Sequence, residues 1–119
     1  MATHNPNPLR DQFEVHNGIL TLSVEGPFGM HKSTFARFWD GPYFISDSQY
    51  VKDSMVGISA NLKGKKLYIS VHVTDMDSDS LPASAIVTLK DDTGSKRFPQ
   101  ELAIAQYDVV IFQFIIELV

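Results

Sequence analysis

Apolar residues recur at every second position along much of this chain, and this spacing limits the fold more than any other feature. In KLYISVHVTD, residues 66–75, apolar side chains alternate with polar or amphipathic ones. Successive side chains of a β-strand point to opposite faces, so a period of two is typical of a strand with one buried face. ASAIVTLK, which begins at Ala83, repeats the pattern. The spacing therefore predicts a protein built mainly from β-strands.

The last segment, YDVVIFQFIIELV, is apolar at nearly every position. Gln113 and Glu117 are the two polar interruptions after Asp108. Such a run predicts a strand buried on both faces, either in the centre of a sheet or at a contact between subunits. A helix is the alternative, but the β-branched and aromatic residues favour the strand.

Two glycine-containing dipeptides predict hairpin turns. Asn17-Gly18 separates FEVH from ILTLSVE and suits a type I′ turn. Gly64-Lys65 follows SMVGISANLK and precedes KLYISVHVTD, with glycine first as a type II′ turn requires. In each case a two-residue turn sets a register that puts the apolar residues of both strands on one face. We expect an antiparallel hairpin at each site.

These segments define the expected architecture. A short helix is expected at Ser33–Trp39, because a serine or threonine can cap it and three aromatic residues then share one face. RFPQELAIA is either irregular or a short strand, and Pro99 confines it to a sheet edge or a strand start. The expected strands are Phe13–His16, Ile19–Glu25, Met55–Leu62, Leu67–Asp75, Ala83–Lys90 and Val109–Leu118.

The fold class expected is all-β and mainly antiparallel. Strands of this length, separated by turn signals, are typical of a β-sandwich or flattened barrel of six to seven strands, here with one short helix. Residues 1–11 are expected to form a flexible N-terminal tail, and residues 12–119 a single β-sandwich domain.

Composition excludes several functional classes. A net charge of −4 argues against nucleic acid as a partner, since phosphate binding calls for a basic surface. The absence of cysteine excludes disulfides, thiolate metal sites and a cysteine nucleophile. No apolar run approaches the ~20 residues that span a bilayer, and MATHNPNPLRDQ lacks the pattern of a signal peptide. We expect a cytoplasmic protein without a membrane span.

The stretch GPFGMHKS resembles the spelling of a phosphate-binding P-loop, with Gly26, Lys32 and Ser33 in register. His31 stands where the second glycine belongs, and the preceding strand is expected to lie in an antiparallel hairpin. A P-loop requires a parallel βαβ unit. We therefore interpret the stretch as a turn, with Lys32 in solvent.

Two groups of residues are candidate sites. Asp75, Asp77 and Asp79 offer the oxygen ligands that calcium prefers, although a solvated acidic connection between strands is the favoured explanation. Aromatic residues gather in the 26–50 segment, where they could form either core or a ligand site. The candidate ligand-binding residues are Trp39, Tyr43, Phe44, Tyr50 and His72.

No arrangement of residues indicates an enzyme. The first hypothesis is a non-enzymatic binding or interaction module without a cofactor, whose partner is another protein or a second copy of itself in a homo-oligomer. The alternative is a β-sandwich that binds a small ligand or carbohydrate through the aromatic 26–50 segment, with calcium as an aid. Exposure of Trp39, and a concave pocket near Tyr43 and His72, would favour the second hypothesis.

Overall fold

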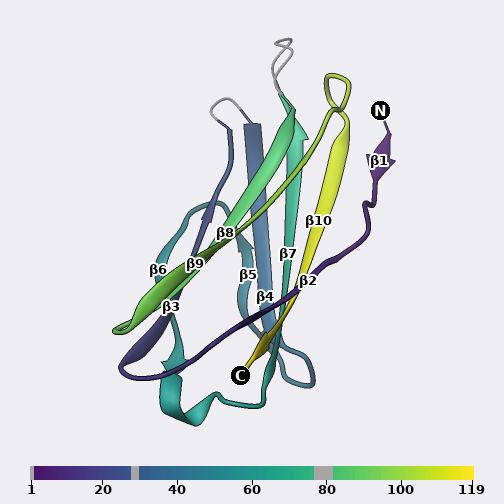
Figure 1. The fold of residues 1–119 in the computed structure, drawn as a ribbon. Helices are drawn as coiled ribbons and strands as arrows, with labels where there is room; N and C mark the ends of the chain where they lie inside the picture. The colour runs from purple at the N-terminus through teal and green to yellow at the C-terminus, as the bar shows by residue number, and fades with distance from the viewer. Residues whose placement is uncertain (1, 28–29, 77–81) are drawn as a thin grey trace.

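The computed structural model describes residues 2–27, 30–76 and 82–119. Within these residues, ten strands form two sheets that stack face to face (Figure 1). The expected all-β, mainly antiparallel sandwich is confirmed, although it has more strands than the six or seven predicted. The chain ends lie at opposite ends of the molecule (Figure 1).

Sheet A has six strands. Its order is β1 (Thr3–His4), β10 (Val109–Leu118), β7 (Lys66–Asp75), β4 (Met30–Phe38) and β5 (Tyr43–Ser48), and β2 (Leu9–Phe13) also pairs with β10. β1 and β2 run parallel to β10, and the other pairs in this sheet are antiparallel.

Sheet B has four antiparallel strands. Its order is β6 (Val51–Ile58), β3 (Ile19–Glu25), β8 (Ala83–Asp91) and β9 (Gly94–Leu102). A single 3₁₀ turn, η1 (Ser59–Asn61), follows β6 and is the only helix among the described residues. β9 is an edge strand, as the proline at position 99 requires.

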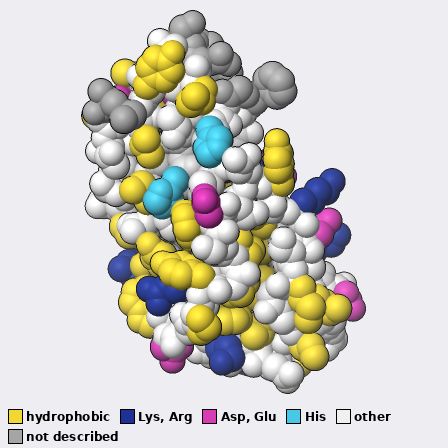
Figure 2. Space-filling model, turned by 180° about the vertical axis from the view of Figure 1, so that it is seen from behind, with side chains coloured by type: hydrophobic (Ala, Val, Ile, Leu, Met, Phe, Trp, Pro, Cys, Tyr) yellow, Lys and Arg dark blue, Asp and Glu magenta, His cyan; other side chains and the backbone are white. Residues whose placement is uncertain are grey.

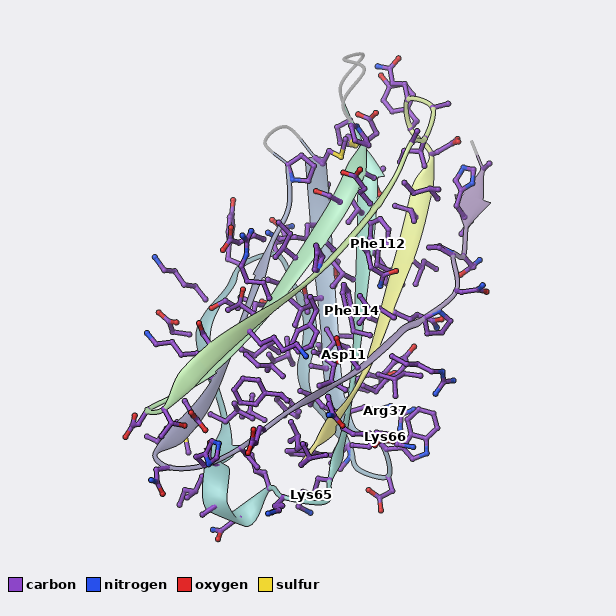
Figure 3. The ribbon with its side chains drawn as sticks, viewed as in Figure 1. Asp11, Arg37, Lys65, Lys66, Phe112 and Phe114 are labelled. Carbon is purple, nitrogen blue, oxygen red and sulfur yellow. The ribbon has the colours of Figure 1, made fainter. Side chains whose placement is uncertain are left out.

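The inner faces of the two sheets form the core. Phe112 and Phe114 of β10, drawn in Figure 3, are fully buried between the sheets. Alternate residues of β7, Leu67 to Val73, pack with them, and Leu20 and Leu22 of β3 come from sheet B. Each buried side chain of this size contributes about 1.5–3 kcal/mol.

β10 lies in the interior of sheet A, between β7 and the N-terminal strands. The apolar C-terminal run therefore has neighbours within one chain, and a subunit contact is not required to explain it. The first residues differ from the expected loose tail, since Thr3–His4 and Leu9–Phe13 form strands beside β10. Pro6 and Pro8 have no N–H to donate, and they lie where this pairing is interrupted.

Both predicted hairpins are wrong. β3 pairs with β6 and β8 and not with Phe13–His16, while β6 and β7 lie in different sheets. The glycine turns themselves are present, with left-handed φ values of 83° at Gly18 and 90° at Gly64. Alternating residues share one core whether two strands pair side by side or face each other across a sandwich, so the pattern did not identify the partner.

The predicted helix at Ser33–Trp39 is also wrong. Residues 30–38 form β4, which pairs with β7 over its whole length and with β5 on its other side. Serine, threonine and phenylalanine are indifferent helix formers, whereas aromatic and β-branched residues suit a sheet. Pairing with β7 along the whole strand, and with β5 between Thr34 and Arg37, outweighs the helical spacing of its aromatic residues.

Candidate functional site

The outer face of sheet A carries a row of aromatic and polar side chains. Tyr68, Ser70 and His72 alternate with the core residues of β7 and so point away from sheet B. The register places Phe35 of β4 and Gln113 of β10 on either side of Ser70. The face of the molecule seen in Figure 2 shows histidine, acidic and hydrophobic side chains gathered together.

These residues line a groove of about 430 Å³, which we call the sheet A groove. Its wall includes Phe35, Tyr43, Tyr68, Ser70, His72 and Gln113. The volume is within the ~300–1,000 Å³ of small-molecule sites, which combine aromatic surface with a few polar groups. These side chains belong to four neighbouring strands of one sheet, β10, β7, β4 and β5, and cross-strand pairing fixes the backbone that forms the floor of the groove.

The aromatic rings of the groove contact one another. The Phe35 ring lies 6.1 Å from that of Tyr43 in an edge-on arrangement and 5.1 Å from the His72 imidazole. At the other end, the rings of Trp39 and Tyr68 are 6.2 Å apart. Edge-on and tilted contacts of this kind are the favourable geometries for aromatic pairs.

Arg37 holds two of these rings in place. Its guanidinium carbon lies 5.5 Å from the ring centre of Tyr43 and 5.2 Å from that of Tyr68. Its Nη1 donates a hydrogen bond to the Trp39 carbonyl at 2.8 Å, and Lys66 lies over the Trp39 ring (Figure 3). Cation–π contacts near a surface contribute about 0.5–1 kcal/mol each, so they favour these ring positions over others.

Gln113 is similarly anchored. Its side-chain amide donates to the Tyr68 hydroxyl oxygen at 2.9 Å, and its backbone carbonyl accepts from the Gln100 amide at 2.8 Å. Because the Tyr68 oxygen serves as an acceptor here, its own O–H is available to donate to a molecule in the groove.

Ser33, Asp47 and His72 lie close together but do not form a nucleophilic triad. The Ser33 hydroxyl donates to the Asp47 carboxylate, and Ser33 is buried. His72 is the cross-strand neighbour of Ser33, but no hydrogen bond joins them in the described structure. Burial lowers the pKa of His72, and the Asp47 carboxylate only partly offsets this effect. The lowered pKa favours the neutral imidazole at pH 7. A neutral imidazole both donates and accepts hydrogen bonds.

The structure distributes the five predicted ligand-binding residues over several places. Tyr43 and His72 line the sheet A groove. Trp39 lies next to the groove, where its ring contacts the ring of Tyr68. Phe44 instead packs against Phe38, 5.5 Å away, and Tyr50 lines a different pocket. The exposed fractions are 47% for Trp39, 51% for Tyr43, 38% for Phe44 and 87% for Tyr50.

Sequence reasoning missed Phe35, Tyr68 and Gln113. The helix expected at Ser33–Trp39 includes Phe35, and the sequence pattern identifies Tyr68 only as an amphipathic position of a strand and Gln113 only as a polar interruption of an apolar run. The signal that could have found Tyr68 is the outer face of Lys66–Asp75, where Tyr68, Ser70 and His72 alternate with core residues. Gly57, which the predicted hairpin at Gly64-Lys65 would place opposite His72, instead pairs with Leu20 in sheet B.

The calcium prediction stays untested. Asp75 is buried at the end of β7, where its backbone N–H donates to the Asp108 carbonyl, and Asp77 and Asp79 lie outside the described residues. In the described ranges, no three histidine or acidic side chains come together as metal ligands would.

No helix among the described residues has the length and apolar character needed to cross a membrane. Comparison of the chain with protein-family models, with curated proteins and with solved structures finds no match.

Proposed function

We propose that this protein is a non-catalytic binding module that takes a carbohydrate-like ligand in the sheet A groove. One observation carries the proposal: Phe35, Tyr43 and Tyr68 share the groove with the hydroxyl, imidazole and amide groups of Ser70, His72 and Gln113. A sugar ring has an apolar face and a polar edge, and this groove offers surfaces of both kinds.

The exposure of the aromatic residues supports this ligand class. Trp39 and Tyr43 are each about half exposed, at 47% and 51%, although large aromatic side chains are normally buried in a core. Arg37 lies over the Tyr43 ring, and the Trp39 ring contacts Lys66 and the Tyr68 ring, so hydrophobic packing alone does not hold them. Ordered, exposed rings provide contact area at a low cost in side-chain entropy.

The proposal is tested by titrating the protein with cellohexaose, mannohexaose and hexagalacturonate. The protein has a single tryptophan, and the Trp39 ring is 6.2 Å from that of Tyr68. Ligand against Tyr68 is therefore expected to change the tryptophan fluorescence in a saturable way with at least one of the three sugars. Isothermal titration calorimetry then gives the affinity.

A matched pair of variants assigns the site. Tyr43→Ala is expected to weaken binding about tenfold, since stacking of a base on one aromatic ring is worth about 1–3 kcal/mol and the apolar face of a sugar makes the same kind of contact. Tyr50→Ala removes an exposed tyrosine outside the groove and should bind as the wild type does. Equal affinities for the two variants, or no response to any sugar, would contradict the proposal.

A further inference from the structure

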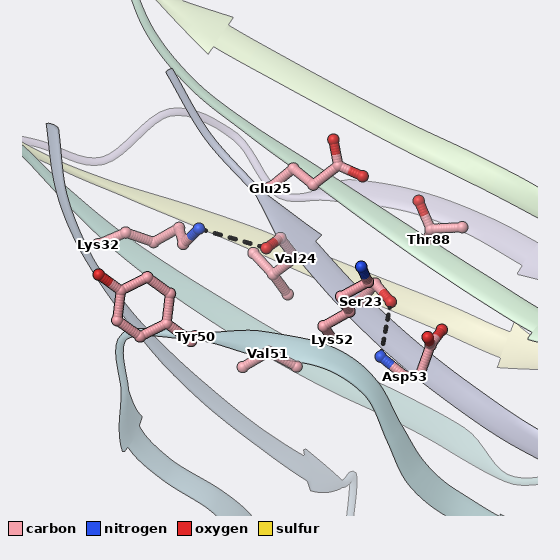
Figure 4. A pocket seen from close by; sticks show the side chains of 9 residues that line it. All are labelled: Ser23, Val24, Glu25, Lys32, Tyr50, Val51, Lys52, Asp53 and Thr88. Atoms are coloured by element: carbon pink, nitrogen blue, oxygen red, sulfur yellow. Dashed lines mark hydrogen bonds between the residues drawn. The ribbon is translucent and has the colours of Figure 1, made fainter. Parts of the chain in front are cut away.

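A second pocket, of about 440 Å³, lies away from the sheet A groove, where β3 and β6 of sheet B face β4 (Figure 4). It opens at a β-bulge. Leu22 pairs with Ser54 and Val24 with Val51, so β6 has one more residue than β3 in this interval. The bulge contains Asp53, with a left-handed φ of 49°, and the Asp53 N–H donates to Ser23 Oγ at 2.9 Å. Bulges of this kind often redirect side chains next to functional sites.

Lys32 enters this pocket from the other sheet. It lies two residues before Thr34, whose side chain is fully buried, so it starts on the inner face of β4. Its chain crosses toward β3, and Nζ donates to the Val24 carbonyl at 3.3 Å (Figure 4). The lysine that the P-loop-like stretch singled out is thus not in free solvent, as the sequence suggested, but half-buried between the sheets.

The surroundings of Lys32 shift its amine toward the uncharged form relative to a lysine in solvent. No carboxylate of the described residues lies within ion-pairing distance of Lys32, in contrast to Lys96, which is 3.1 Å from Asp11. Burial lowers the pKa of Lys32, and the Glu25 carboxylate only partly offsets this effect. Lysines in such places supply the amine nucleophiles that form imines with carbonyl compounds.

We propose that Lys32 is a nucleophilic amine, and that the pocket around it admits a small aldehyde with which it condenses. The neutral amine nitrogen forms a bond to the carbonyl carbon. The two amine protons and the carbonyl oxygen leave as water, and a C=N bond remains. The step involves no change of oxidation state. The Tyr50 ring and the Thr88 hydroxyl, which line the same pocket, offer contacts to the body of the aldehyde.

The experiment uses pyridoxal as the aldehyde and sodium cyanoborohydride to trap the imine, followed by peptide mapping by mass spectrometry. At pH 7.5 and limiting reagent, Lys32 is expected to be labelled faster than exposed Lys63, because a lowered pKa leaves a larger fraction of the amine neutral. Labelling of Lys32 no faster than Lys63 would overturn the proposal.

Two pairs of variants keep the result interpretable. Lys32→Arg should remove the fast-labelled site and Lys63→Arg should retain it, with thermal melts confirming that both proteins are folded. Glu25→Gln removes the carboxylate that favours the charged amine and should speed the labelling of Lys32, whereas Glu14→Gln, distant in sequence and exposed, should not. Slower labelling in Glu25→Gln would count against the proposal. The outcome is independent of sugar binding in the sheet A groove.

Discussion

Replacing Asp91 with asparagine should destabilise the fold and remove part of its dependence on pH. The buried Asp91 carboxylate ends β8 and accepts four hydrogen bonds. Oδ2 accepts from the His16 N–H at 2.9 Å and the Ser59 hydroxyl at 3.0 Å, and Oδ1 accepts from the Thr93 N–H at 2.9 Å and its hydroxyl at 2.7 Å. One side chain thus ties together the segment that precedes β3, η1 and the β8–β9 turn.

The loss of stability in Asp91→Asn can be calculated from the hydrogen bonds and from the pKa of Asp91. Asparagine has one oxygen and one NH₂ group where aspartate has two oxygens. In either orientation of the amide, the NH₂ group faces the backbone N–H of His16 or of Thr93, which then has no acceptor. An unsatisfied buried donor costs about 1–3 kcal/mol of stability. The hydrogen bonds lower the pKa of Asp91 from 3.8 to about 2, against the opposing effect of burial. At about 1.4 kcal/mol per unit, this shift corresponds to about 2 kcal/mol of stability.

The sign of the pH effect is fixed by the direction of the shift. Between pH 3.8 and about 2 the unfolded chain binds the Asp91 proton more readily than the folded protein does, so stability falls as the pH falls. The contribution is complete at pH 6, and roughly half of it is lost by pH 3. Asp91→Asn lacks this contribution at every pH.

Urea unfolding followed by far-UV circular dichroism at pH 6 and pH 3 measures both effects. Asp91→Asn is expected to be about 2–3 kcal/mol less stable at pH 6, with a gap that narrows by about 1 kcal/mol at pH 3. Asp92→Asn, which changes the exposed neighbouring carboxylate, is the control and should match the wild type. A gap below about 0.5 kcal/mol at pH 6, or one that does not narrow, would refute the reasoning.

Three further changes test the fold. Phe114→Ala empties a fully buried site and should cost about 3–5 kcal/mol in urea unfolding, whereas a loss below about 1 kcal/mol would contradict its place in the core. Gly18→Ala should lower the free energy of unfolding by about 1–2 kcal/mol, because φ is 83° and a Cβ would meet the Asp92 carboxyl. An unchanged melting temperature would contradict the left-handed turn at Gly18. His4→Ala removes the 2.8 Å bond to Asp108 and should speed amide exchange in β1 without affecting β7. Equal exchange in β1 of both proteins would show that the bond does not hold the strand.

The sequence predicted the strands better than their partners. Period-two alternation correctly indicated strands at Ile19–Glu25 and Lys66–Asp75, and the turn glycines have the left-handed backbone that their dipeptides implied. A turn fixes only the local direction of the chain, however, and alternation is satisfied equally by a neighbour in the same sheet or in the opposite one. The pairing of β7 with β4 and β10 depends on contacts far apart in sequence, which no local pattern encodes.

The sequence predicted only part of the candidate site, for the same reason. Tyr43 and His72 were predicted from the exposed aromatic segment and from an outward-facing strand position, and they line one groove. Phe35 and Gln113 join them through the registers of β4 and β10 on β7. The pocket at Lys32 depends in addition on a bulge in β6. The bulge has the sequence VKDS, residues 51–54, and contains no glycine that would predict it.

A nuclear magnetic resonance titration tests the central proposal most directly. Uniformly ¹⁵N-labelled protein is titrated with cellohexaose, mannohexaose and hexagalacturonate, and amide shifts are followed residue by residue. The proposal predicts saturable shifts for at least one sugar, concentrated at Phe35, Tyr43, Ser70 and Gln113 and absent from the outer face of β8. Shifts concentrated elsewhere, or no saturable shift with any of the three, would contradict a carbohydrate site in the sheet A groove.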